Sequence, residues 1–243
     1  MSVSVQKAIV TLSGGYDSVA ALLWSLEHYK TRALFIDYGQ PYLEQEQQAL
    51  WYVVDQPQIQ QHPAWRGLDM IRVDLRPALE ANSSWIPYRN LVIGAVAVNW
   101  AVGHAASVVV VGSKSKEWRP DDPVSYKDST LPFFEGLEQL VDEATEPGRR
   151  GMAPRFEMPL VGWDKKRVLA YIRDAGLDLT KLWNCYRTDG IWAPCGECAH
   201  CRETQHILET FRAFGTMPAL IGDMEDSSRT SRHPDDDATG IKE

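Results

Sequence analysis

The sequence predicts an α/β fold with an open, mostly parallel sheet and helices on both faces. Short apolar runs typical of buried strands alternate with helical patterns, and most of these runs end at a turn that contains glycine. The length of 243 residues suits one sizeable core of this kind. In such sheets ligands bind beyond the carboxyl ends of the strands, so we expect the functional site in the turns that follow them.

Four strands are expected from apolar runs of five or six residues. They are Ala8–Leu12, Arg32–Asp37, Met70–Asp74 and Ser107–Val111. Helices that alternate with such strands imply parallel pairing through right-handed crossovers. The strand ends then bring three turns to one edge of the sheet, namely Ser13–Ser18, Asp37–Gln40 and Gly112–Trp118.

Six helices are expected from apolar residues at helical spacing. They are Val19–His28, Glu44–Asp55, Asn90–His104, Phe133–Glu143, Lys165–Asp174 and Arg202–Phe214, the last with Gly215 as C-cap. The helix over 90–104 is apolar on most faces, which predicts that it is buried. Between these elements, Pro57–Trp65 reads as a loop, and the polar segment Trp118–Pro132 as an active-site loop.

Charge and hydropathy exclude several classes of protein. No stretch of eighteen apolar residues occurs and the first seven residues include polar groups without a long apolar run behind them, so we expect neither a membrane span nor a secretory signal but a cytoplasmic protein. The net charge of −8 argues against direct binding of nucleic acid and favours a nucleotide or another small molecule as the ligand.

Half of that charge lies at the carboxyl end of the chain. Residues 222–243 hold seven acidic and three basic residues, a net charge of −4, and they contain few large apolar side chains. Such a segment cannot offset its own ordering entropy. We therefore expect residues 226–243 to form a disordered acidic tail, and residues 1–225 to form a single domain.

The turn after the first expected strand has the features of an anion-binding loop. In Ser13–Ser18 two glycines allow close backbone approach, two hydroxyls can donate, and the following helix directs its amides at the loop. The loop differs from a Walker A motif because no lysine precedes Ser18. The alternative is an ordinary turn, with Asp17 and Ser18 as N-cap residues.

The cysteines indicate a metal site. All four lie within seventeen residues, at Cys185, Cys195, Cys198 and Cys201. A disulfide framework would scatter them, whereas four thiolates at one point suit tetrahedral Zn(II) with no open position, and hence a structural role within residues 183–215. The alternative is redox or thiol-transfer chemistry at Cys195 and Cys198. His200 is expected outside the ligand set.

The segment SGGYDS after the first strand resembles the pyrophosphate loop of the N-type ATP pyrophosphatases, the PP-loop superfamily with the adenine nucleotide alpha hydrolase-like fold. The resemblance implies that the amides of Gly14–Ser18 hold the pyrophosphate of ATP and that Mg(II) helps to neutralise it. Asp17 is a candidate for contacting this metal, with the N-cap role as the alternative.

Three further segments resemble one branch of this superfamily, the 7-cyano-7-deazaguanine synthases. IDYGQ at 36–40 is similar to their FDYGQ signature, and IPYRN at 86–90 is similar to their VPxRN segment. WNCY at 183–186 and CGECAHC at 195–201 match their WxCY and CGxCxxC zinc motifs. The resemblance implies adenylation of a deazapurine acid by ATP and its conversion with ammonia to an amide and then a nitrile, in a family that is often dimeric.

The candidate site residues follow from the loop and from this resemblance. ATP is assigned to Leu12, Ser13, Gly14, Gly15, Tyr16, Asp17, Ser18, Asp37, Gly112 and Lys114; the acceptor to Tyr38, Gln40, Arg89, Asn90 and Asp128; and catalysis to Asp17 and Arg89. Simpler alternatives stay open at three positions: Asp37 as a turn carboxylate, Arg89 in a helix-start ion pair, and Lys114 as a solvated lysine.

The chain departs from the family pattern at two places. Tyr42 stands where the family has histidine, and the segment that ends at Thr130 keeps a tyrosine and Asp128 but lacks the family's cysteine and arginine. A diverged relative that stops at the amide, or that ligates the acid to another acceptor, is therefore an alternative. A tRNA thiolation enzyme of the same superfamily is another, and a nucleotide-binding regulator without turnover is a third.

Overall fold

The computed structural model describes residues 6–75, 86, 88–117, 119, 121, 126–186 and 193–213. Within these residues one five-stranded sheet has the order β3-β2-β1-β4-β5, and every neighbouring pair is parallel. The strands are β1 (Lys7–Thr11), β2 (Lys30–Asp37), β3 (Trp65–Arg72), β4 (Val108–Val110) and β5 (Arg155–Glu157). The predicted open parallel sheet is confirmed.

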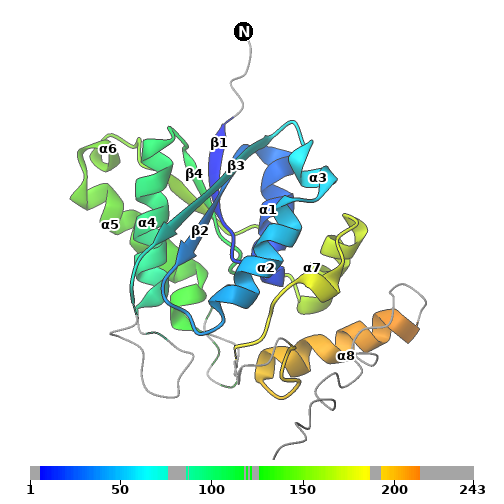
Figure 1. The fold of residues 1–243 in the computed structure, drawn as a ribbon. Helices are drawn as coiled ribbons and strands as arrows, with labels where there is room; N and C mark the ends of the chain where they lie inside the picture. The colour runs from blue at the N-terminus through cyan, green and yellow to red at the C-terminus, as the bar shows by residue number, and fades with distance from the viewer. Residues whose placement is uncertain are drawn as a thin grey trace, which may run out of the picture. The chain divides into compact units, whose positions relative to one another are not determined.

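Helices cover both faces of this sheet, as Figure 1 shows with α1 and α7 on one side and α4 and α5 on the other. The helices are α1 (Tyr16–His28), α2 (Leu43–Val54), α3 (Pro57–Gln60), α4 (Arg89–Gly103), α5 (Leu131–Ala144), α6 (Glu146–Arg149), α7 (Lys165–Asp174) and α8 (Ala199–Ala213). Because side chains alternate along a strand, a central strand between two helical layers must be apolar on both sides. Ile9, Leu34 and Val109 pack with Ala97 and Ala101 of α4 in one cluster.

The order of the strands places a topological switch point at β1. The chain passes through α1 to reach β2 on one side of β1, and later passes through α4 to reach β4 on the other side. Connections that depart in opposite directions leave a crevice at the carboxyl end of the strand between them. The turn at Ser13–Ser18 therefore follows the strand where a ligand is expected to bind.

Several local expectations were wrong. The segment 57–65 is not a loop throughout, because α3 occupies Pro57–Gln60 and β3 begins at Trp65, five residues before the expected start. Strand β5 was missed because its three residues, Arg-Phe-Glu, have no apolar run. Helix α4 is not buried all round: Val102 is 56% exposed, since only the side with Gly94 and Ala97 packs inward.

The chain divides into two compact units, Met1–Ile207 and Leu208–Glu243. The first contains the sheet, α1 to α7 and the start of α8, and the described part of the second is the end of α8. The expected domain boundary at 225, the acidic tail, and Phe214 with Gly215 lie outside the described residues. No helix of the described residues is long and apolar enough to cross a membrane.

Candidate functional site

The turn after β1 is held in shape by its own hydroxyl groups. The Ser18 hydroxyl donates to the carbonyl of Gly15 (2.8 Å) and accepts from the amide of Ser13 (3.1 Å). The amide of Gly15 donates to the Ser13 hydroxyl (3.3 Å). These bonds hold the turn closed. The amides of the first turn of α1 have no intrahelical partners, as at the start of any α-helix. These free amides are compatible with the predicted anion-binding turn, which stays a prediction.

Two glycines in and beside this turn are required by close packing. Gly14 has φ +87°, and a Cβ there would lie 2.8 Å from the backbone carbonyl oxygen of Glu46. A Cβ on Gly112, two residues after β4, would lie 2.8 Å from the backbone of Asp17. Both distances are below ordinary contact. A side chain at either position would therefore push the turn at Ser13–Ser18, called the phosphate turn below after its predicted role, away from its neighbours.

Asp17 forms an ion pair with a lysine that the sequence analysis did not single out. Both carboxylate oxygens of Asp17 accept from the Lys165 ammonium, at 3.0 and 2.9 Å. The lysine side chain is 2% exposed, and Asp164, the N-cap of α7, fixes the first turn of that helix by accepting from the amide of Arg167. Gly15 is the N-cap of α1, so Asp17 does not take the alternative N-cap role.

The charges around Asp17 lower its pKa. Burial alone would raise the pKa of this carboxyl, but the ammonium groups of Lys165 and Lys114 outweigh burial and bring it below the usual range. Lys165 could have been noticed in the sequence as a lysine at the start of an amphipathic helix that follows an N-cap aspartate. That pattern alone does not show that the side chain points inward.

Lys114 and His200 also line the cavity near Asp17. Lys114 lies 3.5 Å from a carboxylate oxygen of Glu203 in α8, rather than in solvent as a free lysine. Burial, helped by the charges of Lys165 and Lys114, lowers the pKa of His200 to about 4, so its imidazole is neutral. The sequence analysis expected His200 outside the metal ligands, but it did not predict that His200 lines the same cavity as the phosphate turn.

Three residues that line this cavity each have a buried polar atom with no hydrogen-bond partner in the described part of the chain. These atoms are Nε1 of Trp183, Nε2 of His200 and Oε2 of Glu203. Buried polar atoms are usually satisfied, so three such atoms at one cavity mark positions where a bound molecule or ordered water completes the hydrogen bonding.

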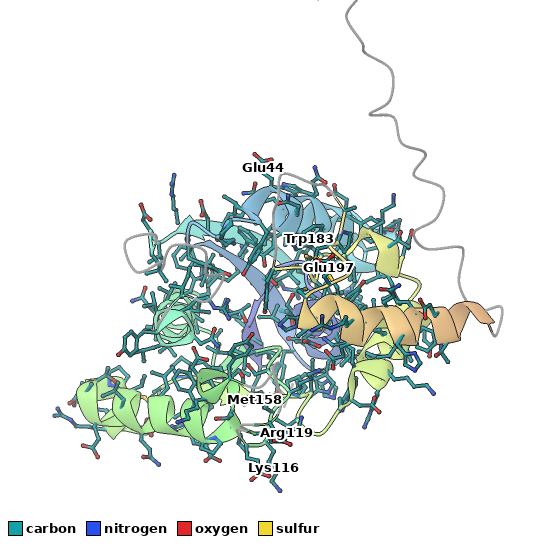
Figure 2. All side chains as sticks on the ribbon, turned by 90° about the horizontal axis from the view of Figure 1, so that it is seen from below. Glu44, Lys116, Arg119, Met158, Trp183 and Glu197 are labelled. Atoms are coloured by element: carbon teal, nitrogen blue, oxygen red, sulfur yellow. The ribbon has the colours of Figure 1, made fainter. Side chains whose placement is uncertain are left out.

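The segment that precedes the cysteine cluster contacts the phosphate turn directly. The amide of Trp183 donates to the carbonyl of Gly14 at 3.3 Å, and a Cβ on Gly15 would lie 3.1 Å from the carbonyl oxygen of Trp183. Figure 2 looks onto the carboxyl ends of the strands and shows Trp183 and Glu197 in the middle of the view, between Glu44 and Arg119. The carboxyl-terminal segment thus forms part of the site.

The four cysteines are gathered into one cluster. One ligand atom from each of Cys185, Cys195, Cys198 and Cys201 lies within 4.8 Å of all the others, which is the donor set predicted for zinc. Backbone amides point at the sulfurs: Cys198 donates to Cys195 at 3.3 Å, and Cys201 donates to Cys198 at 3.4 Å. Such amides favour thiolate ligands, so the residues present fit a tetrahedral metal ion.

Another part of the cavity wall, called the acceptor end below, is lined by tyrosines and two charged side chains. Arg89, at the start of α4, donates to the Tyr38 hydroxyl (3.5 Å) and stacks over its ring with the guanidinium carbon 5.7 Å from the ring centre. Tyr186 stacks on Tyr42, with ring centres 5.5 Å apart. Among the described residues Arg89 has no carboxylate within ion-pair distance, so they do not support the alternative of a helix-start ion pair.

Glu46 of α2 is the second charged group at this end, and sequence reasoning missed it. It lies on the buried side of the helix with Ala49 and Leu50, is 8% exposed, and lines the cavity. Burial raises its pKa to about 7. The signal in the sequence was a carboxylate three and four residues before apolar positions, which is where an amphipathic helix normally has an apolar side chain.

Other predicted site residues lie behind the cavity wall. The Asp37 carboxylate accepts from the amide of Gly39 (2.9 Å) and lies 3.6 Å from Arg72, which matches its alternative role as a turn carboxylate. Gln40 accepts from the amide of Tyr38 and donates to Glu46.

Asn90 lines the cavity and donates to the backbone carbonyl of Asp128, while the Asp128 side chain is not among the lining groups. Leu12, Ser13, Gly15, Tyr16, Ser18, Gly112 and Lys114 line the same cavity of about 270 Å³.

A five-stranded parallel sheet with a glycine-containing turn at its switch point, together with a four-cysteine cluster, defines an open α/β protein with a candidate metal site. The family model described as queuosine biosynthesis protein QueC matches residues 7–212. The chain therefore belongs to the QueC family.

Curated relatives are similar over most of their length. The 7-cyano-7-deazaguanine synthase of Azotobacter vinelandii is 29% identical over 210 residues, covering 81% of this chain and 91% of the relative. That of Synechococcus sp. (strain CC9311) is 26% identical over 215 residues, covering 83% and 92%. Among solved structures, the U34-tRNA thiolase NcsA of Methanococcus maripaludis with its 4Fe–4S cluster has a TM-score of 0.42 and 11% identity, covering 88% of this chain and 67% of that one.

Proposed function

We propose that the protein converts 7-carboxy-7-deazaguanine, ATP and ammonia to 7-cyano-7-deazaguanine. The observation that carries the proposal is the family match across residues 7–212, which spans both ends of the cavity. In the first half of the reaction the acid attacks the α-phosphate of ATP and releases pyrophosphate, and ammonia then displaces AMP to give the amide. In the second half the amide oxygen is adenylated with release of a second pyrophosphate, and loss of AMP and a proton leaves the nitrile.

The phosphate turn supports the ATP half of this reaction. The free amides at the start of α1 can hold the β- and γ-phosphates, and Lys165 and Lys114 can stabilise the negative charge that develops on the leaving pyrophosphate. Mg(II) belongs to the proposal as the ion bound with ATP. Asp17 is the carboxylate at the turn, and it would have to share its oxygens between this ion and Lys165.

The other end of the cavity supports the acceptor half. Arg89 has no carboxylate partner in the described part of the chain, so its guanidinium is available to the acid before adenylation. Asn90 holds the backbone of Asp128 and so positions the segment around Ser129. Zinc bound by the four cysteines has a structural role in this proposal and takes no part in the bond changes.

The test is one incubation of zinc-loaded protein with the acid, ATP, Mg(II) and ammonium, analysed by mass spectrometry. We expect the nitrile, with two AMP formed per nitrile. Accumulation of the amide with one AMP would show the diverged activity, and unchanged acid with folded, zinc-loaded protein would overturn the proposal. Alkylation of Cys195 in zinc-free protein, combined with a tRNA-binding assay, tests the thiolation alternative.

A further inference from the structure

Glu46 occupies a position where a carboxylate is costly unless it has a function. Its helix neighbours on the same side are apolar, and it is 8% exposed. Among the described residues it forms one hydrogen bond, in which the Gln40 amide donates to Oε2 at 2.7 Å, and no ion pair. A buried carboxylate that served the fold alone would be expected to pair with a cation.

Arg89 lines the same cavity, and it also has no counterion among the described residues. No Arg89–Glu46 pair forms within ion-pair distance, although both side chains belong to the same cavity wall. A guanidinium and a carboxyl group that line one cavity without pairing suit a ligand that carries hydrogen-bond donors at one edge and an anionic group at another.

A deazaguanine acid has that distribution of groups. Its guanine-type ring has an N1–H beside a 2-amino group, which are two adjacent donors, and its carboxylate lies on the other ring. An ionised carboxylate only accepts hydrogen bonds, so it matches two adjacent donors. Adenine has the N1 acceptor next to its amino group, and an ionised carboxylate would meet that acceptor unfavourably.

The aromatic residues at this end fit a flat bicyclic ring. Tyr38, Tyr126 and Tyr186 line the cavity together with Glu46. Tyrosine rings offer flat apolar surfaces for a planar heterocycle. Gln40 does not line the cavity, but its amide is fixed between the backbone of Tyr38 and Glu46, so it orients the carboxylate.

We propose that Glu46 is the specificity-determining residue for the acceptor, that it accepts hydrogen bonds from the N1–H and 2-amino groups of the deazaguanine acid, and that Gln40 is its positioning residue. This inference rests on the proposed function for the identity of the acceptor. It gives a recognition role to Glu46, which is not one of the residues that the family resemblance implies for the acceptor.

The test compares two acids in three proteins: wild type, Glu46→Gln, and the matched control Glu44→Gln. Glu44 is on the same helix, is exposed, and lies at the edge of the molecule in the view of Figure 2. The acids are 7-carboxy-7-deazaguanine and its analogue that lacks the 2-amino group.

We expect Glu46→Gln to raise KM for 7-carboxy-7-deazaguanine about 10- to 100-fold and to leave KM for ATP unchanged. The variant should also lose most of the preference for this acid over the analogue that lacks the 2-amino group. Gln40→Ala should raise the same KM by a smaller factor, and Glu44→Gln should behave as wild type. An equal loss for both acids, an altered KM for ATP, or no change in Glu46→Gln would overturn the inference.

A binding measurement separates this inference from the proposed function. Calorimetric titration of wild type and Glu46→Gln with 7-deazaguanine, which has the donor edge but no carboxylate, needs no turnover. Tighter binding to wild type than to the variant, with no nitrile formed from the acid, would sink the proposed function and support the role of Glu46. Nitrile formation together with equal binding of 7-deazaguanine by wild type and variant would support the proposed function and overturn the role of Glu46. Wild type alone, tested with the two acids, covers the case in which the variant does not fold.

Discussion

The two ends of the cavity manage charge in different ways. At the phosphate end the charges are paired without a ligand, Asp17 with Lys165 and Lys114 with Glu203. At the acceptor end Arg89 and Glu46 face the same cavity and neither has a counterion among the described residues. A paired end can tolerate ligands that come and go, whereas an unpaired end gains most when a ligand of matching charge arrives. Chemical selectivity is therefore expected at the acceptor end.

The largest expected effect comes from the segment that both ends share. Trp183 contacts the phosphate turn, and Tyr186 lies at the acceptor end, two and one residues from Cys185. Cys201→Ser should lose bound metal, lower the thermal midpoint and abolish activity, because a structural zinc site contributes directly to folding. Metal content and thermal unfolding measure this. Glu197→Gln, at an exposed position between the ligands, is the control, and retained metal with an unchanged midpoint in Cys201→Ser would contradict the prediction.

A change at Lys165 should affect the phosphate end alone. Lys165→Ala leaves Asp17 as an uncompensated charge beside the phosphates, and we expect kcat/KM for ATP to fall about 1000-fold, or about 4 kcal/mol. Binding of 7-deazaguanine should stay the same. Lys166→Ala, one residue along on the exposed side of α7, is the control for charge. If the alanine variant at 165 keeps its rate with ATP, the paired arrangement has no role in turnover.

The acceptor end should reveal itself in the pH dependence of stability. Burial raises the pKa of Glu46 to about 7, although the Gln40 hydrogen bond and the charge of Arg89 oppose this. The folded protein then holds this proton more tightly than the unfolded chain, whose carboxyl titrates near 4.5. The protonated Glu46 carboxyl therefore stabilises the folded protein, and this contribution to the free energy of unfolding is complete below pH 4.5. It is lost as the pH rises to 7, by up to about 3 kcal/mol.

Urea unfolding at pH 5 and pH 8 measures that loss. Glu46→Gln cannot ionise at this position, so we expect the variant to become more stable relative to wild type at pH 8 than at pH 5. Glu44→Gln should follow the wild-type curve because its carboxylate is exposed. A constant difference between Glu46→Gln and wild type across this range would show that the carboxyl titrates normally.

The smallest of these effects concerns close packing behind the phosphate turn. Gly112→Ala would place a Cβ 2.8 Å from the backbone of Asp17, and we expect a loss of about 2 kcal/mol in stability and a raised KM for ATP. Gly136→Ala is the matched control, because no atom of the described residues lies within 4 Å of a Cβ there and the change favours helix α5. Equal stability of the two variants would mean that the turn can move at no cost.

One part of the phosphate end, the glycine-containing turn, could be recognised in the sequence because its pattern is local. The turn Ser13–Ser18 follows directly on a β-branched strand and precedes a helix, so neighbouring residues carry the whole pattern. The cysteine cluster was predictable for the same reason, since ligand spacing is a property of a short segment.

Both ends also contain side chains that the fold brings in from other helices, and the sequence alone did not identify these. Glu46 and Lys165 come from separate helices, and whether each points inward depends on how α2 and α7 pack against the sheet. The local sequence pattern shows which side of a helix is apolar, but it does not show which residues that side contacts in the fold. Asp37 shows the converse: its strand end was predicted, but its carboxylate is used by the turn and by Arg72.

The contact between Trp183 and Gly14 has a consequence for the order in which the protein is made. Gly14 is synthesised about 170 residues before Trp183, yet the carbonyl of Gly14 accepts its hydrogen bond from the amide of Trp183. The nucleotide turn at the beginning of the chain is thus finished only when the segment next to the cysteines has left the ribosome. A growing chain can form β1 and α1 early, but it gains the complete phosphate end near the close of translation.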